Sequence, residues 1–156
     1  MKRRLADRSG FSLIEMIVTM AILSILAAGI LPLTTVTYKR MKELELRQNL
    51  RTIRRAIDKY KELVDEQRIQ LPPLSSGYPK DLELLVEGAE VIDGTTKMKM
   101  KFLRRIPRDP MMEDGEWGMR SHEDEPDSDV WGGQDVFDVY SKSDQQALDG
   151  SFYRDW

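Results

Sequence analysis

A hydrophobic run follows the first ten residues of this chain. Of the 23 residues from Phe11 to Leu33, 17 are Phe, Leu, Ile, Val, Met or Ala. A helix rises about 1.5 Å per residue, so residues 11–31 extend over roughly 31 Å, which matches a hydrocarbon core of about 30 Å. The pattern therefore predicts a membrane-spanning helix over residues 11–32. Pro32, with Gly29 nearby, is expected to bend or loosen this helix rather than end it.

Beyond Pro32 the hydrophobic residues recur at steps of four and three, as they do along one side of a helix. They are Leu46, Leu50, Ile53, Ile57, Tyr60 and Val64. Charged residues fill many of the remaining positions, and no Pro or Gly interrupts residues 33–66. We expect an amphipathic helix that continues from the first one to about Glu66. A coiled coil is the alternative, but the stripe covers few heptads and a globular remainder follows.

Residues 67–156 predict shorter elements. Leu71-Pro72-Pro73 ends the long helix, and residues 79–87 predict a short helix that stops at Gly88. Met and Lys alternate from Lys97, which indicates a half-buried extended segment. Residues 117–120 and 135–141 predict short strands on either side of an acidic loop, residues 121–133.

Composition narrows the class of protein. The chain has 156 residues and no cysteine, which fits one domain on a membrane stalk with no disulfide. Without residues 1–10 it keeps 20 basic and 26 acidic residues, a net charge of −6. A generally acidic surface argues against a nucleic-acid binder. No catalytic triad order and no glycine-rich phosphate loop is evident, so we expect no enzyme activity.

The basic leader precedes the hydrophobic run in an unusual order. An ordinary secretory signal places its small-residue cleavage site after the hydrophobic stretch, which is then lost. Here the small residue, Gly10, lies before that stretch and directly behind Lys2, Arg3, Arg4 and Arg8. Cleavage after Gly10 removes residues 1–10 and keeps the helix, with Phe11 as the new amino terminus.

The run Gly10-Phe11-Ser12-Leu13-Ile14-Glu15 resembles the prepilin signal of type IV pilins and type II secretion pseudopilins. The resemblance implies cleavage by a prepilin peptidase at Gly10, methylation of the Phe11 amine, and assembly into a homo-oligomeric helical filament.

Glu15 is an acid in a hydrophobic helix. A charge at the centre of a membrane helix costs about 2.5 to 3.5 kcal/mol on insertion scales, so such an acid is a functional candidate. We expect it to meet the Phe11 ammonium of a neighbouring subunit during assembly. The alternative is a carboxylate favoured by the helix dipole and reaching the headgroups. The two interpretations are compatible, and Pro32 is the second residue to which we assign an assembly role.

Four segments of the C-terminal part resemble the major, or G-type, pseudopilin of type II secretion. They are residues 102–110, Trp117-Gly118, residues 138–141 and residues 149–156. The resemblance implies an α+β fold, in which a long N-terminal helix packs on a small antiparallel sheet. It also implies a C-terminal loop that often binds calcium in place of a disulfide.

A calcium site needs six to eight oxygen ligands. Ser141, Ser143, Asp144 and Asp149, with loop carbonyls, are the candidate ligands. Gln145-Gln146 departs from the family, whose loop is often richer in glycine and acid. The alternative is a hydrogen-bonded turn with solvated acids.

Two charged segments remain. The acidic loop fits a solvated, mobile loop better than a metal site, and it could face the basic residues 97–108 of a neighbouring subunit. Those basic residues also leave open DNA binding, as in DNA-uptake pseudopili, although the surrounding acids oppose it.

We therefore expect a non-enzymatic subunit of a type II secretion-like pseudopilus. A type IV pilin, a minor pseudopilin, or a membrane-anchored module that binds DNA or a secreted substrate are the alternatives. Lys and Arg are nearly balanced around the span, so the resemblance, rather than the charge, implies a single pass through the inner membrane with a periplasmic C-terminal part. Expected partners are prepilin peptidase, minor pseudopilins and the inner-membrane secretion platform.

Overall fold

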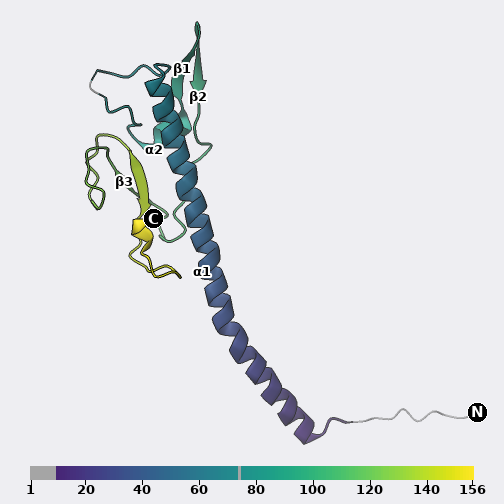
Figure 1. The fold of residues 1–156 in the computed structure, drawn as a ribbon. Helices are drawn as coiled ribbons and strands as arrows, with labels where there is room; N and C mark the ends of the chain where they lie inside the picture. Colours follow the sequence, from purple (N-terminus) through teal and green to yellow (C-terminus); the bar gives the residue numbers. More distant parts are fainter. Residues whose placement is uncertain (1–9, 74) are drawn as a thin grey trace, which may run out of the picture. The chain divides into compact units, whose positions relative to one another are not determined.

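The computed structural model describes residues 10–73 and 75–156, and at residues 29–33 it describes the backbone alone. Two compact units divide the chain, one that ends at Lys39 and one formed by Arg40–Trp156. The long helix α1 (Leu13–Asp65) contributes residues to both (Figure 1). Its last residue agrees with the helix predicted to about Glu66.

Short elements make up the rest of the C-terminal unit. They are α2 (Leu82–Glu87), β1 (Ala89–Asp93), β2 (Thr96–Met100), β3 (Trp117–Arg120), β4 (Asp138–Ser141) and the 3-10 helix η1 (Tyr153–Asp155). With α1 they form an α+β fold, a long N-terminal helix with small antiparallel sheets, which confirms the predicted type IV pilin-like class.

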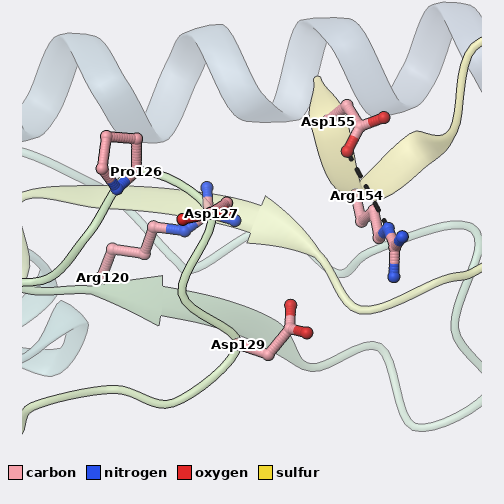
Figure 2. Close-up of a pocket in the computed structure, with 6 residues that line it drawn as sticks. All are labelled: Arg120, Pro126, Asp127, Asp129, Arg154 and Asp155. Atoms are coloured by element: carbon pink, nitrogen blue, oxygen red, sulfur yellow. Dashed lines mark ion pairs between the residues drawn. The ribbon is translucent and has the colours of Figure 1, made fainter.

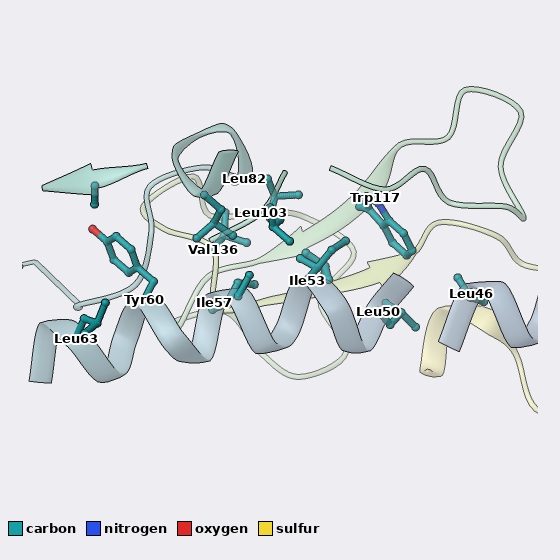
Figure 3. Packing of buried hydrophobic residues seen from close by; sticks show 14 of the residues in the cluster. Leu46, Leu50, Ile53, Ile57, Tyr60, Leu63, Leu82, Leu103, Trp117 and Val136 are labelled. Carbon is teal, nitrogen blue, oxygen red and sulfur yellow. The ribbon is translucent and has the colours of Figure 1, made fainter. Parts of the chain in front are cut away.

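The hydrophobic stripe of α1 forms the centre of the core in the C-terminal unit. Leu46, Leu50, Ile53, Ile57 and Tyr60 are each no more than 2 % exposed. Figure 3 shows these side chains pointing from one side of the helix toward residues of the later segments. Those partners are Leu82, Leu103, Trp117 and Val136. The stripe thus does what its spacing predicted, and the neighbouring Ala56 and Leu63 are buried as well.

The strands form two antiparallel pairs among the described residues instead of the one small sheet that we expected. β1 pairs with β2 and β3 pairs with β4. Strand β1 was not predicted, because the alternation of Ala89, Glu90 and Val91 is too short to indicate a strand by itself. Its partner β2 is extended as predicted but is not half-buried, since four of its five residues are exposed. Gly94 has a φ of +61°, which suits the tight connection between β1 and β2.

Two predicted elements are shorter than expected. Helix α2 begins at Leu82 rather than Pro79, because the Asp81 carboxylate caps it by accepting a hydrogen bond from the Leu84 N–H at 2.8 Å. Strand β4 begins at Asp138 rather than Asp135, because the Val136 N–H donates to the Pro79 carbonyl outside the sheet. The predicted stop is correct, since Gly88 caps α2 with a φ of +92°.

Candidate functional site

The predicted cleavage site lies just before α1. Gly10 and Phe11 precede the first helical residue, and both are exposed. Among the described residues, no atom lies within 4 Å of the place where a Cβ on Gly10 would be. Gly10 also has no positive φ that would require glycine. The fold of the described chain therefore gives no reason for glycine at this position, which is the expected situation when an outside enzyme selects it.

Glu15 lies in the first turn of α1, where the Met16 N–H already donates to the Ser12 carbonyl at 3.1 Å. A carboxylate in this turn is favoured by the positive end of the helix dipole. The side chain is exposed, and the described part of the chain shows no ion pair to it. Both interpretations of Glu15 are therefore still open, the dipole contact and a cation from a second subunit.

Hydrophobic side chains cover the described first part of α1 on all sides. The large exposed ones are Leu13, Ile14, Met16, Ile17, Val18, Met20, Ile22, Leu23, Ile25 and Leu26, and Phe11, just before the helix, is exposed as well. Phe11 is 80 % exposed and Ile17 is 59 % exposed. A contiguous hydrophobic surface of this extent indicates contact with lipid or with other protein chains.

Two hydroxyl residues of this segment, Thr19 and Ser24, hydrogen-bond to their own helix. Thr19 Oγ1 donates to the Met16 carbonyl at 3.0 Å, and Ser24 Oγ donates to the Met20 carbonyl at 2.8 Å. A hydroxyl bonded back to its own helix exposes no unpaired donor to a hydrophobic surrounding. The two residues therefore leave the hydrophobic surface suitable for burial.

The structure describes only the backbone at residues 29–33, which include the end of the predicted membrane span and the assembly residue Pro32. The α1 backbone continues through Pro32, so the proline does not end the helix, as predicted. The Pro32 side chain lies outside the described residues, and so do the other side chains of residues 29–33. Among the described residues, no helix has both the length and the hydrophobicity to cross a membrane.

The N-terminal part thus has an exposed glycine before a long helix, an acid in the first helical turn and exposed hydrophobic residues around the helix. Residues 5–31 match the prokaryotic N-terminal methylation motif. The motif includes Gly10, Phe11 and Glu15, and it implies processing by a prepilin peptidase and assembly into filaments. No curated protein and no solved structure matched the chain. The methylation motif thus supports the N-terminal resemblance and does not extend to the C-terminal unit.

The four predicted calcium ligands do not share one surrounding. Ser141 and Ser143 are buried, and their hydroxyls accept hydrogen bonds from the Ser143 and Gln145 N–H groups at 3.3 and 3.4 Å. Asp144 pairs with Arg154, whose Nη1 lies 3.3 Å from Asp144 Oδ1. Among the described residues, no three His, Cys, Asp or Glu gather closely enough to hold a metal ion.

Asp149 is also engaged by the chain itself. Its Oδ1 accepts hydrogen bonds from the Ser151 N–H at 3.0 Å and the Ser151 hydroxyl at 2.6 Å, and its Oδ2 lies 3.3 Å from Arg47 Nη2. The Ser151 hydrogen bonds and then the Arg47 charge lower the pKa of Asp149 from its usual value. The donor set as folded therefore fits an arginine-paired turn better than a calcium cage, and calcium binding stays an untested prediction.

The sequence reasoning missed Glu43, which connects α1 to the end of the chain. Glu43 is 8 % exposed, and its Oε1 accepts hydrogen bonds from Tyr153 Oη at 2.9 Å and the Leu148 N–H at 2.8 Å. Burial and the Glu43 carboxylate raise the pKa of Tyr153 to about 12. Glu43 lies three residues before Leu46, so it occupies the next position of the hydrophobic stripe. An acid at such a position was the sign in the sequence that this residue is buried.

Arg54 is a second residue whose role the sequence did not indicate. It is one of the charged residues between the positions of the hydrophobic stripe, and it is partly buried and makes four hydrogen bonds at 2.6 to 3.1 Å. Its guanidinium donates to the Asp138 carboxylate and to the carbonyls of Val139 and Trp156. Arg54 thereby links α1 to β4 and to the last described residue.

The acidic loop is organised around one of its members. The Asp124 carboxylate accepts hydrogen bonds from the N–H groups of Ser121 and Gly132 at 2.7 and 3.0 Å, and these bonds lower the pKa of Asp124. Figure 2 shows Asp127 and Asp129 of the same loop beside a cavity of about 460 Å³, which Arg120 and Arg154 also line. Charges of both signs line the cavity, so it favours no single class of ligand.

Proposed function

We propose that this chain is a structural subunit of a type II secretion-like pseudopilus, similar to the major pseudopilin. One observation carries the proposal: the N-terminal methylation motif lies at the beginning of a continuous 53-residue helix. The exposed hydrophobic side chains of the first part of that helix support it, because they need a covering that the described chain does not provide.

In this proposal the subunit has two successive surroundings. It is first stored in the inner membrane by a single pass of residues 11–32, with its C-terminal unit in the periplasm. Prepilin peptidase then cleaves after Gly10, and the subunits leave the bilayer together. Their helices become the core of the filament, so the hydrophobic surface exchanges lipid for neighbouring helices and stays out of water in both states.

Glu15 gives this assembly its register. Cleavage creates an ammonium group on Phe11, four residues before the carboxylate. In a staggered array the ammonium of one subunit meets the Glu15 carboxylate of the next. A paired charge is far cheaper to keep in a hydrophobic surrounding than a lone one, so correctly staggered neighbours are selected.

The growing filament then acts as a piston or plug that moves folded proteins outward. This chain supplies a moving surface and no chemistry, and the energy comes from a partner. Minor pseudopilins and the inner-membrane secretion platform complete the machine in this proposal.

Mass spectrometry of the mature amino terminus, combined with imaging of cells that overproduce the protein, tests the proposal. We expect a mature chain that begins with methylated Phe11, together with short periplasmic filaments. A mature protein that still begins at Met1, or one that stays monomeric in its native envelope, would contradict it.

A charge-neutral variant tests the role of Glu15. Glu15→Gln should leave cleavage and methylation intact and greatly reduce filament formation, because the amide cannot neutralise the Phe11 ammonium. Glu45→Gln, at an exposed acid on the same helix in the C-terminal unit, is the matched control and should form filaments normally. Normal filaments from Glu15→Gln would remove the assignment.

An exposed basic surface supports a second candidate, a membrane-anchored module that binds DNA. Lys97, Lys99 and Lys101 are exposed, and the described residues show no ion pair to any of them. Retention of the full chain on DNA that falls steeply with added salt would favour this candidate. Retention that is weak at every salt concentration would favour the pseudopilus.

A further inference from the structure

The C-terminal loop, defined here as residues 142–156, is fastened to α1 by the chain's own side chains. Glu43 holds it through the Leu148 N–H and the Tyr153 hydroxyl, at 2.8 and 2.9 Å. Arg54 holds its far end through the Trp156 carbonyl at 2.7 Å. These contacts join residues about 100 positions apart in the sequence, so they fix the loop in the tertiary fold.

The two acids expected to bind calcium both face arginines. Asp149 pairs with Arg47 of α1 at 3.3 Å, and Asp144 pairs with Arg154 of the loop itself at 3.3 Å. Each carboxylate therefore has a positive charge beside it already. The charge balance that a bound Ca²⁺ would provide is supplied from within the chain.

Arg47 also makes a second contact with the loop. Its guanidinium carbon lies 4.1 Å from the centre of the Trp156 ring, which is a cation–π contact. The Trp156 indole N–H in turn donates to the Ser151 hydroxyl at 2.7 Å, and that hydroxyl donates to Asp149. Arg47, Trp156, Ser151 and Asp149 thus form a closed ring of contacts around the turn.

We propose that the C-terminal loop is closed by Arg47 and Arg154 in place of a calcium ion. Calcium takes six to eight oxygen ligands, and a compact cage needs its carboxylates directed at one point. Here the two carboxylates are directed at two different guanidinium groups, one on α1 and one on η1. For both carboxylates to bind one calcium ion, the two ion pairs would have to break, and with them the ring of contacts around Asp149.

The proposal does not depend on the filament role, because loop closure is a property of the single chain. The test uses the full chain in detergent micelles and measures hydrogen exchange of the backbone amides in residues 142–156. Each measurement is made in millimolar calcium and again in excess chelator, and a thermal melt accompanies it.

We expect the exchange rates and the melting temperature of the wild-type chain to be the same with calcium and with chelator. Arg47→Ala should raise exchange in the loop about tenfold, since an exposed ion pair and a cation–π contact are each modest. Arg55→Ala is the matched control, an exposed arginine on α1 for which the described residues show no ion pair, and it should leave exchange unchanged.

Two results would overturn the proposal. One is slower loop exchange or a higher melting temperature in calcium for the wild-type chain. The other is unchanged loop exchange in Arg47→Ala. Because neither readout involves filaments, a failure here is distinguishable from a failure of the proposed pseudopilus role.

Discussion

The two compact units of this protein use the same kinds of hydrophobic residue in opposite ways. In the unit that ends at Lys39, the large hydrophobic side chains that the structure describes point outward, with Phe11 80 % exposed. In Arg40–Trp156 many of them point inward, with Leu46 and Ile53 fully buried. One continuous helix, α1, contributes to both units, so helix propensity does not cause the difference. Within Arg40–Trp156, the burial of the α1 side chains comes from the later segments that pack on them.

This comparison indicates where each unit obtains its stability. The C-terminal unit has its own core and obtains stability from burying its own surface. In the first unit the described hydrophobic side chains are exposed, so they are available for contacts with lipid or with other chains. Substitutions in the first unit should therefore affect association, and substitutions in the second should affect folding.

The largest effect should come from identical substitutions in the two parts of α1. Ile53→Ala removes buried atoms from the core and should lower the stability of the C-terminal unit by about 2–5 kcal/mol. Ile17→Ala, at a 59 % exposed position, should change it by less than about 0.5 kcal/mol. All three tryptophans lie in Arg40–Trp156, so tryptophan fluorescence during urea unfolding reports on this unit. Equal losses in the two variants would contradict the division.

The next effect concerns the buried acid on the same helix. Glu43→Ala removes the acceptor for the Tyr153 hydroxyl and the Leu148 N–H, which should lower stability by about 1–3 kcal/mol. Glu45→Ala, two residues away and exposed, is the control and should change stability little. Both are measured by urea unfolding. A loss in Glu45→Ala as large as that in Glu43→Ala would mean that the Glu43 contacts are unimportant.

A pH effect should also be confined to the C-terminal unit. The pKa of Tyr153 is raised from 10.0 to about 12, mainly by burial, so the folded state favours the neutral phenol. Its contribution to stability is fully present below pH 10 and is lost as the pH rises through 12. Tyr153→Phe should lose less stability across this window than the wild type does. Parallel curves for the two proteins in thermal melts would show that Tyr153 does not contribute.

The smallest effect should come from an exposed ion pair on α1. Lys59 Nζ and Glu62 Oε2 lie 2.7 Å apart, one helical turn from each other, with both side chains about half exposed. Lys59→Ala should cost only about 0.2–0.5 kcal/mol, because water screens the pair. A loss near that of Ile53→Ala would show that charges, rather than buried hydrophobic surface, stabilise this part of the helix.

The periodic parts of the sequence were sufficient to predict the long helix and the side of it that is buried. Steps of four and three from Leu46 to Tyr60 define one face of a helix in any surrounding, and a run of Phe, Leu, Ile and Val without a stripe defines a helix with no internal partner. The leader was predictable from the sequence as well, because Gly10 lies before the hydrophobic stretch, whereas an ordinary secretory signal has its cleavage site after it.

Tertiary structure decided everything that depended on residues far apart in the sequence. Strand β1 exists because β2 pairs with it, and its own five residues carry too weak a pattern to predict it. Glu43 and Arg54 look like surface charges until the C-terminal loop packs over them. The arginine partners of Asp144 and Asp149 are likewise set by the fold. Local spacing determines which face of an element is hydrophobic, but the partner of a polar group is set by the fold, since buried polar groups bond to whatever the packed chain brings within reach.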